Sequence, residues 1–229
     1  MKPPEWPKLA ESLNLSGVAV LPELMPQSTC AELAGLYEDD SLFRSRVVMS
    51  RHGFGRGEYK YFNYPLPAEI ARLRAMLYPP LSLIANRWNE QLGEPLRFPQ
   101  DHQQFLARCH AAGQCRATPL LLRYVEGDYN CLHQDLYGEH VFPLQVTILL
   151  SKPGEEFDGG ELVLTEQRPR MQSRAEVIPL QRGDAAIFAV NQRPVQGSRG
   201  TYRVRHRHGV SRLRRGSRHT LGIIFHDAT

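Results

Sequence analysis

The chain has 229 residues, of which 41% are hydrophobic and 23% are charged, a balance typical of a globular protein and unlike that of a disordered or fibrous one. Its formal net charge of +4 is mild. No stretch approaches the roughly 18 to 20 apolar residues of a membrane helix, and the first residues lack the apolar run of a signal peptide. The four cysteines are scattered and form no C-x-x-C pair, as in a reducing compartment. We therefore expect a cytoplasmic protein that does not contact a membrane.

The first half of the chain is predicted to be mostly helical. Residues 17–24 (GVAVLPEL) could form a short strand. Apolar residues then recur at helical spacing in three stretches, residues 28–40, 67–92 and 101–113. Ser28 is a candidate cap for the first of them. We expect Pro79 and Pro80 to break the second stretch into two helices, because a proline lacks the N–H that an inner helical turn needs.

From about residue 118 the period of the apolar residues changes. Short β-rich runs follow one another, and Gly, Pro, Asp and Asn separate most of them. The runs are residues 119–128, 142–151, 160–166, 175–180, 184–190, 201–210 and 219–227. Seven or eight short strands in about 110 residues suggest a sandwich or jelly roll. We therefore expect an α+β, mainly β protein, in which a mostly helical part (residues 1–117) packs on one sheet of a β core (residues 118–229) as one compact unit.

A histidine and an aspartate stand two residues apart in the stretch NCLHQDLYGEH, residues 130–140. Side chains at i and i+2 of a strand point to the same face. A strand from Leu132 to Leu136 would therefore aim His133 and Asp135 at one spot. An imidazole and a carboxylate that meet there could bind a metal, act as an acid–base pair or make an ordinary hydrogen bond.

The second half of the chain holds a partner for this pair. His208 falls at the end of one predicted strand and Arg218 at the start of the next, so antiparallel neighbours could bring both into one pocket. Two histidines and one carboxylate form the facial triad of non-haem Fe(II) oxygenases, which leaves coordination positions open. A buried arginine can hold a carboxylate by two parallel hydrogen bonds. His206 is a rival to His208, because it shares the same strand face.

The ordered set of His133, Asp135, His208 and Arg218 resembles the Fe(II)- and 2-oxoglutarate-dependent dioxygenases. The resemblance covers about residues 118–227 and implies a double-stranded β-helix, which is a jelly roll. Each residue alone is a weak signal, and the order and spacing together are a strong one. The family spacing downstream of the second histidine favours His208 over His206.

Tyr124 and Gly127 extend this resemblance, since Tyr-x-x-Gly before the first histidine is similar to both prolyl hydroxylases and AlkB-like demethylases. The resemblance implies that Fe(II) is held by His133, Asp135 and His208, and that 2-oxoglutarate and O2 complete the site. It also implies that the distal carboxylate of 2-oxoglutarate pairs with Arg218 and accepts hydrogen bonds from Thr220 and Tyr124. The reaction would hydroxylate the substrate and release succinate and CO2.

The substrate stays open between a nucleic acid, a protein and a small molecule. AlkB-like enzymes carry an Asn two residues before the tyrosine, where this chain has Leu122, and a second Arg six residues after the first, where it has Ile224. Gly-Gly-Glu-Leu at residues 159–162 is instead similar to prolyl hydroxylases. The chain as a whole also resembles a bacterial branch of the superfamily described as acting oxidatively on damaged DNA.

Nine arginines fall between Arg193 and Arg218, a segment without any acidic residue. They could be a solvated face with one or two buried members, or a site for anionic ligands. The three at residues 203, 205 and 207 have the opposite strand parity to His208, so we expect them on the outer face. Those at residues 212, 214 and 215 are expected near the rim of the site. A jelly-roll or basic nucleic-acid-binding protein without catalysis is the alternative, but it would not need the triad.

Overall fold

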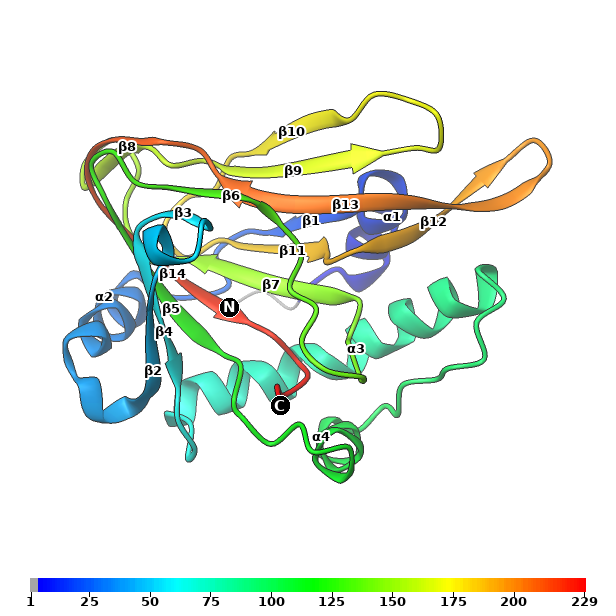
Figure 1. Cartoon of the computed structure of the whole chain (residues 1–229), viewed down its shortest axis with the longest axis horizontal. Coiled ribbons are helices and arrows are strands. Elements are labelled where there is room, and N and C mark those ends of the chain that lie inside the picture. Colours follow the sequence, from blue (N-terminus) through cyan, green and yellow to red (C-terminus); the bar gives the residue numbers. More distant parts are fainter. Residues whose placement is uncertain (1–3) are drawn as a thin grey trace.

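The computed structural model describes residues 4–229, which form two stacked antiparallel sheets (Figure 1). The larger sheet has the order β1 (Val18–Leu21), β11 (Ala185–Ala189), β7 (Leu144–Leu149), β14 (Leu213–Ile223), β5 (Leu120–Val125), β4 (Glu58–Phe62) and β2 (Phe43–Val48), and β8 (Phe157–Gly159) pairs with β14. The smaller sheet has the order β10 (Arg174–Ile178), β9 (Leu162–Gln167), β13 (Gly200–Val210), β6 (Tyr129–His133) and β3 (Gly55–Arg56), and β12 (Gln192–Gly197) pairs with β13. This arrangement confirms the mainly β jelly roll that was predicted.

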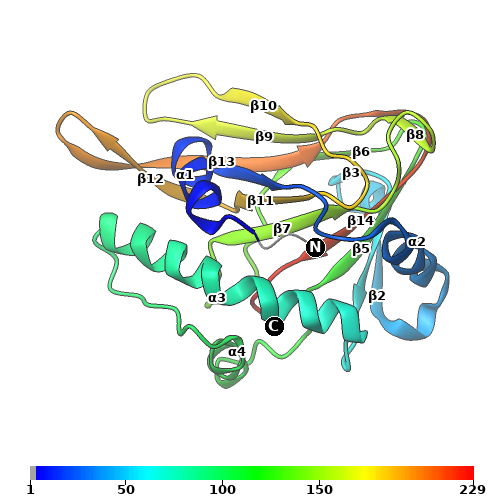
Figure 2. The same cartoon turned by 180° about the vertical axis from the view of Figure 1, so that it is seen from behind.

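The helices are α1 (Trp6–Ser16), α2 (Gln27–Gly35), α3 (Ala68–Gln91) and α4 (His102–Ala111), with three short 3₁₀ turns, Leu36–Glu38, Asp40–Leu42 and Met49–Arg51. Seen from behind, α3 and α4 lie along the outer face of the larger sheet, as Figure 2 shows. None of the helices within residues 4–229 has the length and apolar character needed to cross a membrane.

The two largest apolar cores among the described residues lie on the two faces of the larger sheet. Strand β11 is buried on both faces, because Ile187 packs in the core on the helix side and Phe188 packs in the core between the sheets. Its sequence is therefore continuously apolar. A strand that is buried on both faces has no polar alternation. On the helix side, Leu77, Tyr78 and Leu81 of α3 are fully buried. The larger sheet is therefore packed on both faces.

Pro79 and Pro80 do not break the long helix into two, contrary to the expectation. Helix α3 runs without interruption from Ala68 to Gln91 and contains both prolines. The buried residues that flank the prolines keep both halves of the helix against the sheet, and this tertiary packing offsets the cost of the missing N–H groups. Ser28 is also not a cap, because α2 begins one residue earlier with Pro26 in the capping position.

The first 117 residues contribute strands as well as helices. The expected short strand is β1, which pairs with β11, and the unexpected strands β2 and β4 extend the larger sheet beyond β5. The unexpected β3 pairs with β6 at the edge of the smaller sheet. The last strand, β14, begins at Leu213 and not near residue 219 as expected, so only two residues separate it from β13. Its polar first half forms a strand because it pairs with β8.

The strand register places the predicted site residues opposite one another. His208 of β13 lies directly opposite His133 of β6 in the smaller sheet. Arg218 of β14 lies opposite Tyr124 of β5 in the larger sheet. Thr220 follows Arg218 on the same face of β14 and is also buried. The two sheets therefore present these side chains to the space between them.

Candidate metal and co-substrate site

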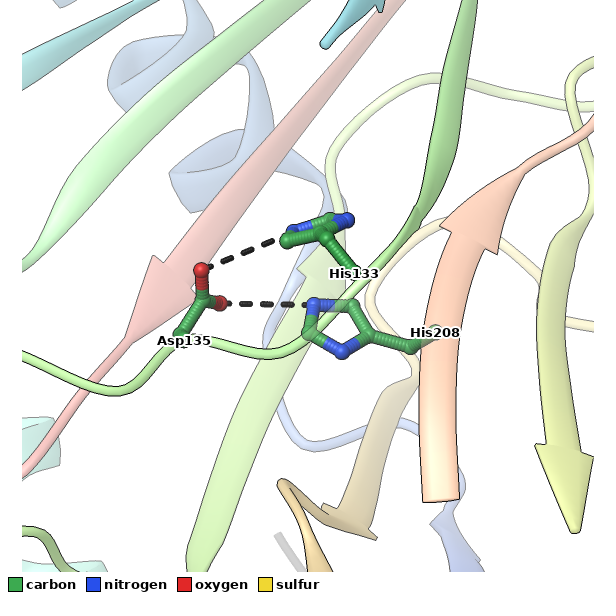
Figure 3. A group of neighbouring side chains, drawn as sticks. All are labelled: His133, Asp135 and His208. Carbon is green, nitrogen blue, oxygen red and sulfur yellow. Dashed lines mark ion pairs between the residues drawn. The ribbon is translucent and has the colours of Figure 1, made fainter. Parts of the chain in front are cut away.

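His133, Asp135 and His208 come together as a cluster whose potential ligand atoms all lie within 4.8 Å of one another (Figure 3). Nε2 of His133 is 3.5 Å from Oδ1 of Asp135, and Nε2 of His208 is 3.3 Å from Oδ2. Asp135 and His208 are buried, whereas His133 is only partly buried. Two imidazoles and one carboxylate in this arrangement fit the facial triad of a non-haem iron, which leaves one side of the metal open.

The two histidines are fixed by the backbone around them. Nδ1 of His133 donates a hydrogen bond to the carbonyl of Cys131 at 2.8 Å, so Nε2 keeps its lone pair for a metal. The pairing of β13 with β6 shifts register between His208 and Val210. Gly209 lies at this irregularity, and a Cβ there would come within 2.7 Å of the carbonyl of Asn130. A glycine thus permits the close approach that brings His208 next to His133.

Asp135 reaches the cluster from outside the strand, contrary to the expectation that residues 132–136 form one strand. Strand β6 ends at His133. Beyond it, the side chain of Gln134 donates hydrogen bonds to the carbonyl of His206 and to Oδ1 of Asn191, at 2.7 and 2.8 Å. A side chain therefore replaces the backbone pairing at this point, and the chain turns so that Asp135 faces both imidazoles.

Two tyrosines that the sequence analysis did not select support Asp135. The hydroxyl of Tyr137 donates a hydrogen bond to Oδ1 of Asp135 at 2.7 Å, and the hydroxyl of Tyr61 donates to that of Tyr137 at 3.0 Å. Such partners orient a metal-binding carboxylate. His-x-Asp-x-Tyr spacing was visible in the sequence, but the contact depends on the loop after β6.

The protonation states of the cluster suit a divalent cation. Burial acts to raise the pKa of Asp135, but the hydrogen bond and charge of His208, followed by His133 and Tyr137, outweigh it and hold this pKa below its usual range. Burial, then the nearby His208, lowers the pKa of His133. A carboxylate beside a neutral imidazole is the form in which these side chains bind a metal.

Arg218 is the buried cation of the site. Its side chain is 2% exposed, and its Nη1 has no hydrogen-bond partner among residues 4–229. Burial lowers the pKa of Arg218 to about 10, so the guanidinium is still charged at neutral pH. A buried, charged and unsatisfied donor is costly unless a ligand satisfies it. The carboxylate of 2-oxoglutarate fits that need.

The segment Gly159–Leu162 lies next to Arg218 and is more than a turn into a strand. Gly160 has a positive φ of 65°, and a Cβ there would come within 3.0 Å of Cδ of Arg218 and 2.6 Å of Cδ1 of Leu213. The glycine therefore leaves the space that the arginine side chain occupies. This gives the Gly-Gly pair a packing reason that its sequence alone did not supply.

A cavity of about 500 Å³ joins the triad to Arg218. Tyr124 and Thr220, the predicted hydrogen-bond donors to the co-substrate, line it too, and Nδ2 of Asn130 lies 3.4 Å from the hydroxyl of Tyr124. The remaining wall is largely apolar and aromatic, with Phe54, Tyr59, Tyr61, Leu120, Leu122 and Phe188. The size and lining are typical of a site for a small molecule. Fe(II) and 2-oxoglutarate thus fit the residues that are present.

His206, the rival ligand, has a different role. It is fully buried, lies outside the metal-binding cluster, and its Nε2 accepts a hydrogen bond from Nε of Arg193 at 3.1 Å. Burial, then the charge of Arg193, lowers the pKa of His206 to about 4. Arg193 also pairs with the buried Glu166. His206 therefore belongs to a structural network that joins strands of the smaller sheet to α1.

Six of the seven exposed arginines between residues 193 and 218 form two groups, and the seventh, Arg199, lies in the turn between β12 and β13. Those at residues 203, 205 and 207 are exposed and alternate with the buried His206 and His208, as their parity predicted. Those at residues 212, 214 and 215 were expected near the rim, but none of them lines the cavity. They lie at the start of β14 beside β8, where Arg215 pairs with Asp158 at 2.6 Å. The short turn between β13 and β14 places them beyond the Arg218 end of the site.

Comparison with known proteins agrees with this site. The Oxygenase-NA family, described as "Oxygenase, catalysing oxidative methylation of damaged DNA", matches residues 57–228. The uncharacterized protein Rv2227 of Mycobacterium tuberculosis (strain H37Rv) is 50% identical over 167 residues, which are 73% of this chain and 72% of that protein.

Solved structures share the fold at low sequence identity. A Pseudomonas putida prolyl-4-hydroxylase matches with a TM-score of 0.55 and 12% identity over 98% of this chain and 99% of that chain. A Trichoplax adhaerens prolyl hydroxylase, in complex with a peptide of hypoxia inducible factor, matches with a TM-score of 0.57 and 14% identity over 95% and 86%. A 2OG-Fe(II) oxygenase family protein of Burkholderia pseudomallei matches with a TM-score of 0.55 and 16% identity over 99% and 93%. The metal cluster and the fold shared with 2OG-Fe(II) oxygenases are consistent with Fe(II) and 2-oxoglutarate as cofactors. Because the family match spans well over half of the sequence, the chain belongs to the Oxygenase-NA family and is an oxygenase.

Proposed function

We propose that this oxygenase hydroxylates a damaged base of a nucleic acid at an iron held by His133, Asp135 and His208. The observation that carries the oxygenase part of the proposal is the position of Arg218. It is a buried, charged side chain with an unsatisfied Nη1, and it lines the same cavity as the three metal-binding side chains. A cation placed beside a facial triad supports a dicarboxylic co-substrate between them.

The residues of the chain have separate roles in this proposal. His133, Asp135 and His208 hold the metal, and Tyr137 keeps the carboxylate in place. When bound, Fe(II) and 2-oxoglutarate would supply the oxidant, since O2 converts 2-oxoglutarate to succinate and CO2 and leaves one oxygen atom for a C–H bond of the substrate. Arg218 binds the distal carboxylate of the co-substrate.

The remaining lining residues complete the pocket. Tyr124 and Thr220 are buried beside Arg218 and offer hydroxyl donors to the same carboxylate. Tyr59, Tyr61 and the other aromatic residues exclude water from the reacting carbon. The protein thus positions the reactants, supplies charge and excludes water, while the oxidative chemistry belongs to the cofactors.

Two features support a nucleic-acid substrate. The family that matches residues 57–228 carries a description that refers to damaged DNA. The cavity wall also contains Phe54, Tyr59, Tyr61 and Tyr137, and a base that leaves its stack is commonly held between aromatic side chains. The departures from AlkB-like enzymes at Leu122 and Ile224 would then reflect a different way of holding the base or the co-substrate.

The first test asks whether the site turns over its co-substrate. The protein with Fe(II), 2-oxoglutarate and O2 should form succinate, and Asp135→Ala should lose both Fe(II) binding and succinate formation. Glu139→Ala is a matched control, because Glu139 is an exposed carboxylate of the same loop. Arg218→Lys should raise the KM for 2-oxoglutarate about tenfold or more, since it loses a forked charged hydrogen bond, and should leave Fe(II) affinity nearly unchanged.

The second test identifies the substrate class. Single-stranded oligonucleotides with methylated bases should stimulate succinate formation and release one formaldehyde for each N-methyl group that is hydroxylated. Proline-containing peptides serve as the comparison, because the fold is shared with prolyl hydroxylases. Stimulation by peptides alone would replace the nucleic-acid substrate with a protein one and leave the oxygenase chemistry intact.

A further inference from the structure

A second, polar hollow of about 360 Å³ adjoins the iron cavity. The two share Leu132 and Gln134 in their walls. The hollow lies on the outer side of the smaller sheet, where Arg205 and Arg207 of β13 project outward, and Figure 1 shows this strand crossing the sheet in orange beside β9. A polymeric substrate that left the iron cavity across Leu132 and Gln134 would therefore pass directly into the hollow.

The hollow has the charge of an anion site. Arg205 and Arg207 line it, and none of its lining residues is acidic within the part of the chain that the structure describes. No ion pair involves either arginine among residues 4–229. Their neighbour Arg203 is exposed on the same face of β13 but pairs with Glu94. Two unpaired guanidinium groups beside a substrate cavity provide positive charge that the fold itself does not use.

The floor between the two cavities is rigid. Gln134 follows the metal-binding His133 in the chain, and its amide is held by Asn191 and by the carbonyl of His206. The position of the hollow relative to the metal is thus set by the same short segment that positions the triad. Ser173 and Thr165 supply hydroxyl groups elsewhere in its wall. These neutral donors and the two arginines suit a phosphate better than a cation or an apolar group.

We propose that this hollow binds the phosphate that flanks the target nucleotide, so that Arg205 and Arg207 hold the strand while the base lies in the iron cavity. The inference rests on the proposed nucleic-acid substrate and deepens it. It locates the strand on the outer face of the smaller sheet, and not on the arginines at residues 212, 214 and 215. Bidentate guanidinium contacts to phosphate fix the register of a strand without reading its sequence.

Binding of a fluorescent single-stranded oligonucleotide tests the proposal without turnover. The protein carries Fe(II) and 2-oxoglutarate under anoxic conditions, and affinity is measured at two or more salt concentrations. The double variant Arg205→Ala/Arg207→Ala should weaken binding about tenfold at low salt. It should also reduce the slope of log affinity against log salt by about 1.4, since each phosphate contact on a single strand contributes about 0.7. Lysine at both positions should restore most of the slope.

Two controls separate this site from general charge. Arg203→Ala removes a paired arginine from the same strand face, and Arg214→Ala removes an exposed one from the opposite end of the site. Both should bind the oligonucleotide as the unchanged protein does. Succinate formation without substrate should be unaffected by all of these variants, because none touches the iron cavity.

The outcomes distinguish failure of the hollow as a phosphate site from failure of the proposed nucleic-acid substrate. If the salt-dependent binding of the unchanged protein persists in the double alanine variant, the hollow is not the phosphate site, but the proposal of a nucleic-acid substrate stands. Absence of binding at every salt concentration, with succinate formation intact, would overturn both the hollow and the nucleic-acid substrate. Binding of a fluorescent acidic peptide that the double alanine variant loses, with no binding of oligonucleotides, would contradict the phosphate site and assign the hollow to a protein substrate instead.

Discussion

The hydroxyl of Tyr137 lies 2.7 Å from Oδ1 of Asp135 and donates a hydrogen bond to it. Tyr137 in turn accepts a hydrogen bond from Tyr61, so a chain of two hydroxyl groups ends on the carboxylate of the metal cluster. Because Asp135 lies beyond the end of β6, no strand pairing fixes it. The tyrosine therefore performs the orientation that the backbone does for His133.

Tyr137→Phe should weaken Fe(II) binding by about 10- to 100-fold, the usual effect of removing an outer partner of a metal-binding side chain. Titration with Fe(II) under anoxic conditions measures this directly. Tyr129→Phe is the control, since Tyr129 is an exposed tyrosine of β6 that does not contact the cluster. Equal Fe(II) affinity in the two variants would show that Tyr137 only fills space.

Gly160→Ala should raise the KM for 2-oxoglutarate without changing Fe(II) affinity. The new Cβ would approach Cδ of Arg218 to 3.0 Å and force the arginine to move. Gly154→Ala is a matched control, because Gly154 also has a positive φ, of 80°, but no atom lies within 4 Å of its Cβ position. Both variants bear a backbone strain of about 1 kcal/mol. A KM that rises equally in both would remove the link to Arg218.

The parts of the site that repeat a local pattern were predictable from the sequence. Strand parity correctly separated His206 and His208 from the exposed arginines, because side chains alternate along any strand. The β-rich run at residues 184–190 likewise predicted the strand β11. These features depend only on neighbours in the chain, so the sequence contains all the information that they need.

The parts that depend on distant partners were not predictable. Pro79 and Pro80 stay within α3 because the buried residues on either side of them, such as Tyr78 and Leu81, hold both halves of the helix against the core. Strand β2 is only half-buried and gave no clear alternation, and it forms because β4 pairs with it. Whether an exposed arginine is free or neutralised also depends on residues far away, such as Glu94 for Arg203.

Acid should destabilise the fold between about pH 6.5 and 4. Burial lowers the pKa of His102, His206 and His226 to about 4 in each case, helped by the charge of Arg74 or Arg193. In the unfolded chain a histidine has a pKa near 6.5, so the unfolded state binds more protons in this window. Stability is therefore complete above about pH 6.5 and is lost as the pH falls towards 4, by about 1.4 kcal/mol per pH unit for each histidine.

Urea unfolding at several pH values measures this loss. His102→Gln should flatten the dependence by about 1.4 kcal/mol per pH unit, because one of the three buried histidines is gone. His102 is suited to the test, since its Nε2 hydrogen-bonds to the carbonyl of Phe225 and the residue is not a member of the metal cluster. An unchanged slope in the variant would mean that His102 is protonated in the folded protein as easily as in the unfolded one.

Asp227→Ala should lower the free energy of unfolding by about 3–5 kcal/mol, because it leaves a buried cation without its partner. Asp227 is fully buried and accepts hydrogen bonds from Nη2 of Arg74 at 2.8 Å, from Tyr64 at 2.9 Å and from Nε2 of His110 at 2.8 Å. Arg74 lies in α3, so this pair ties the end of the chain, just after β14, to the helix behind the larger sheet.

Glu69→Ala is the matched control for this change. Glu69 pairs with Arg72 at 2.6 Å in the same helix but near the surface, and such pairs contribute about 0.2–1 kcal/mol at most. The double change Arg74→Met/Asp227→Ala should recover part of the loss, since it removes the unpaired cation as well. Thermal or urea unfolding compares the three variants with the unchanged protein. If Asp227→Ala cost no more than Glu69→Ala, water or another group would have to satisfy Arg74, and the pair would not anchor the end of β14 to α3.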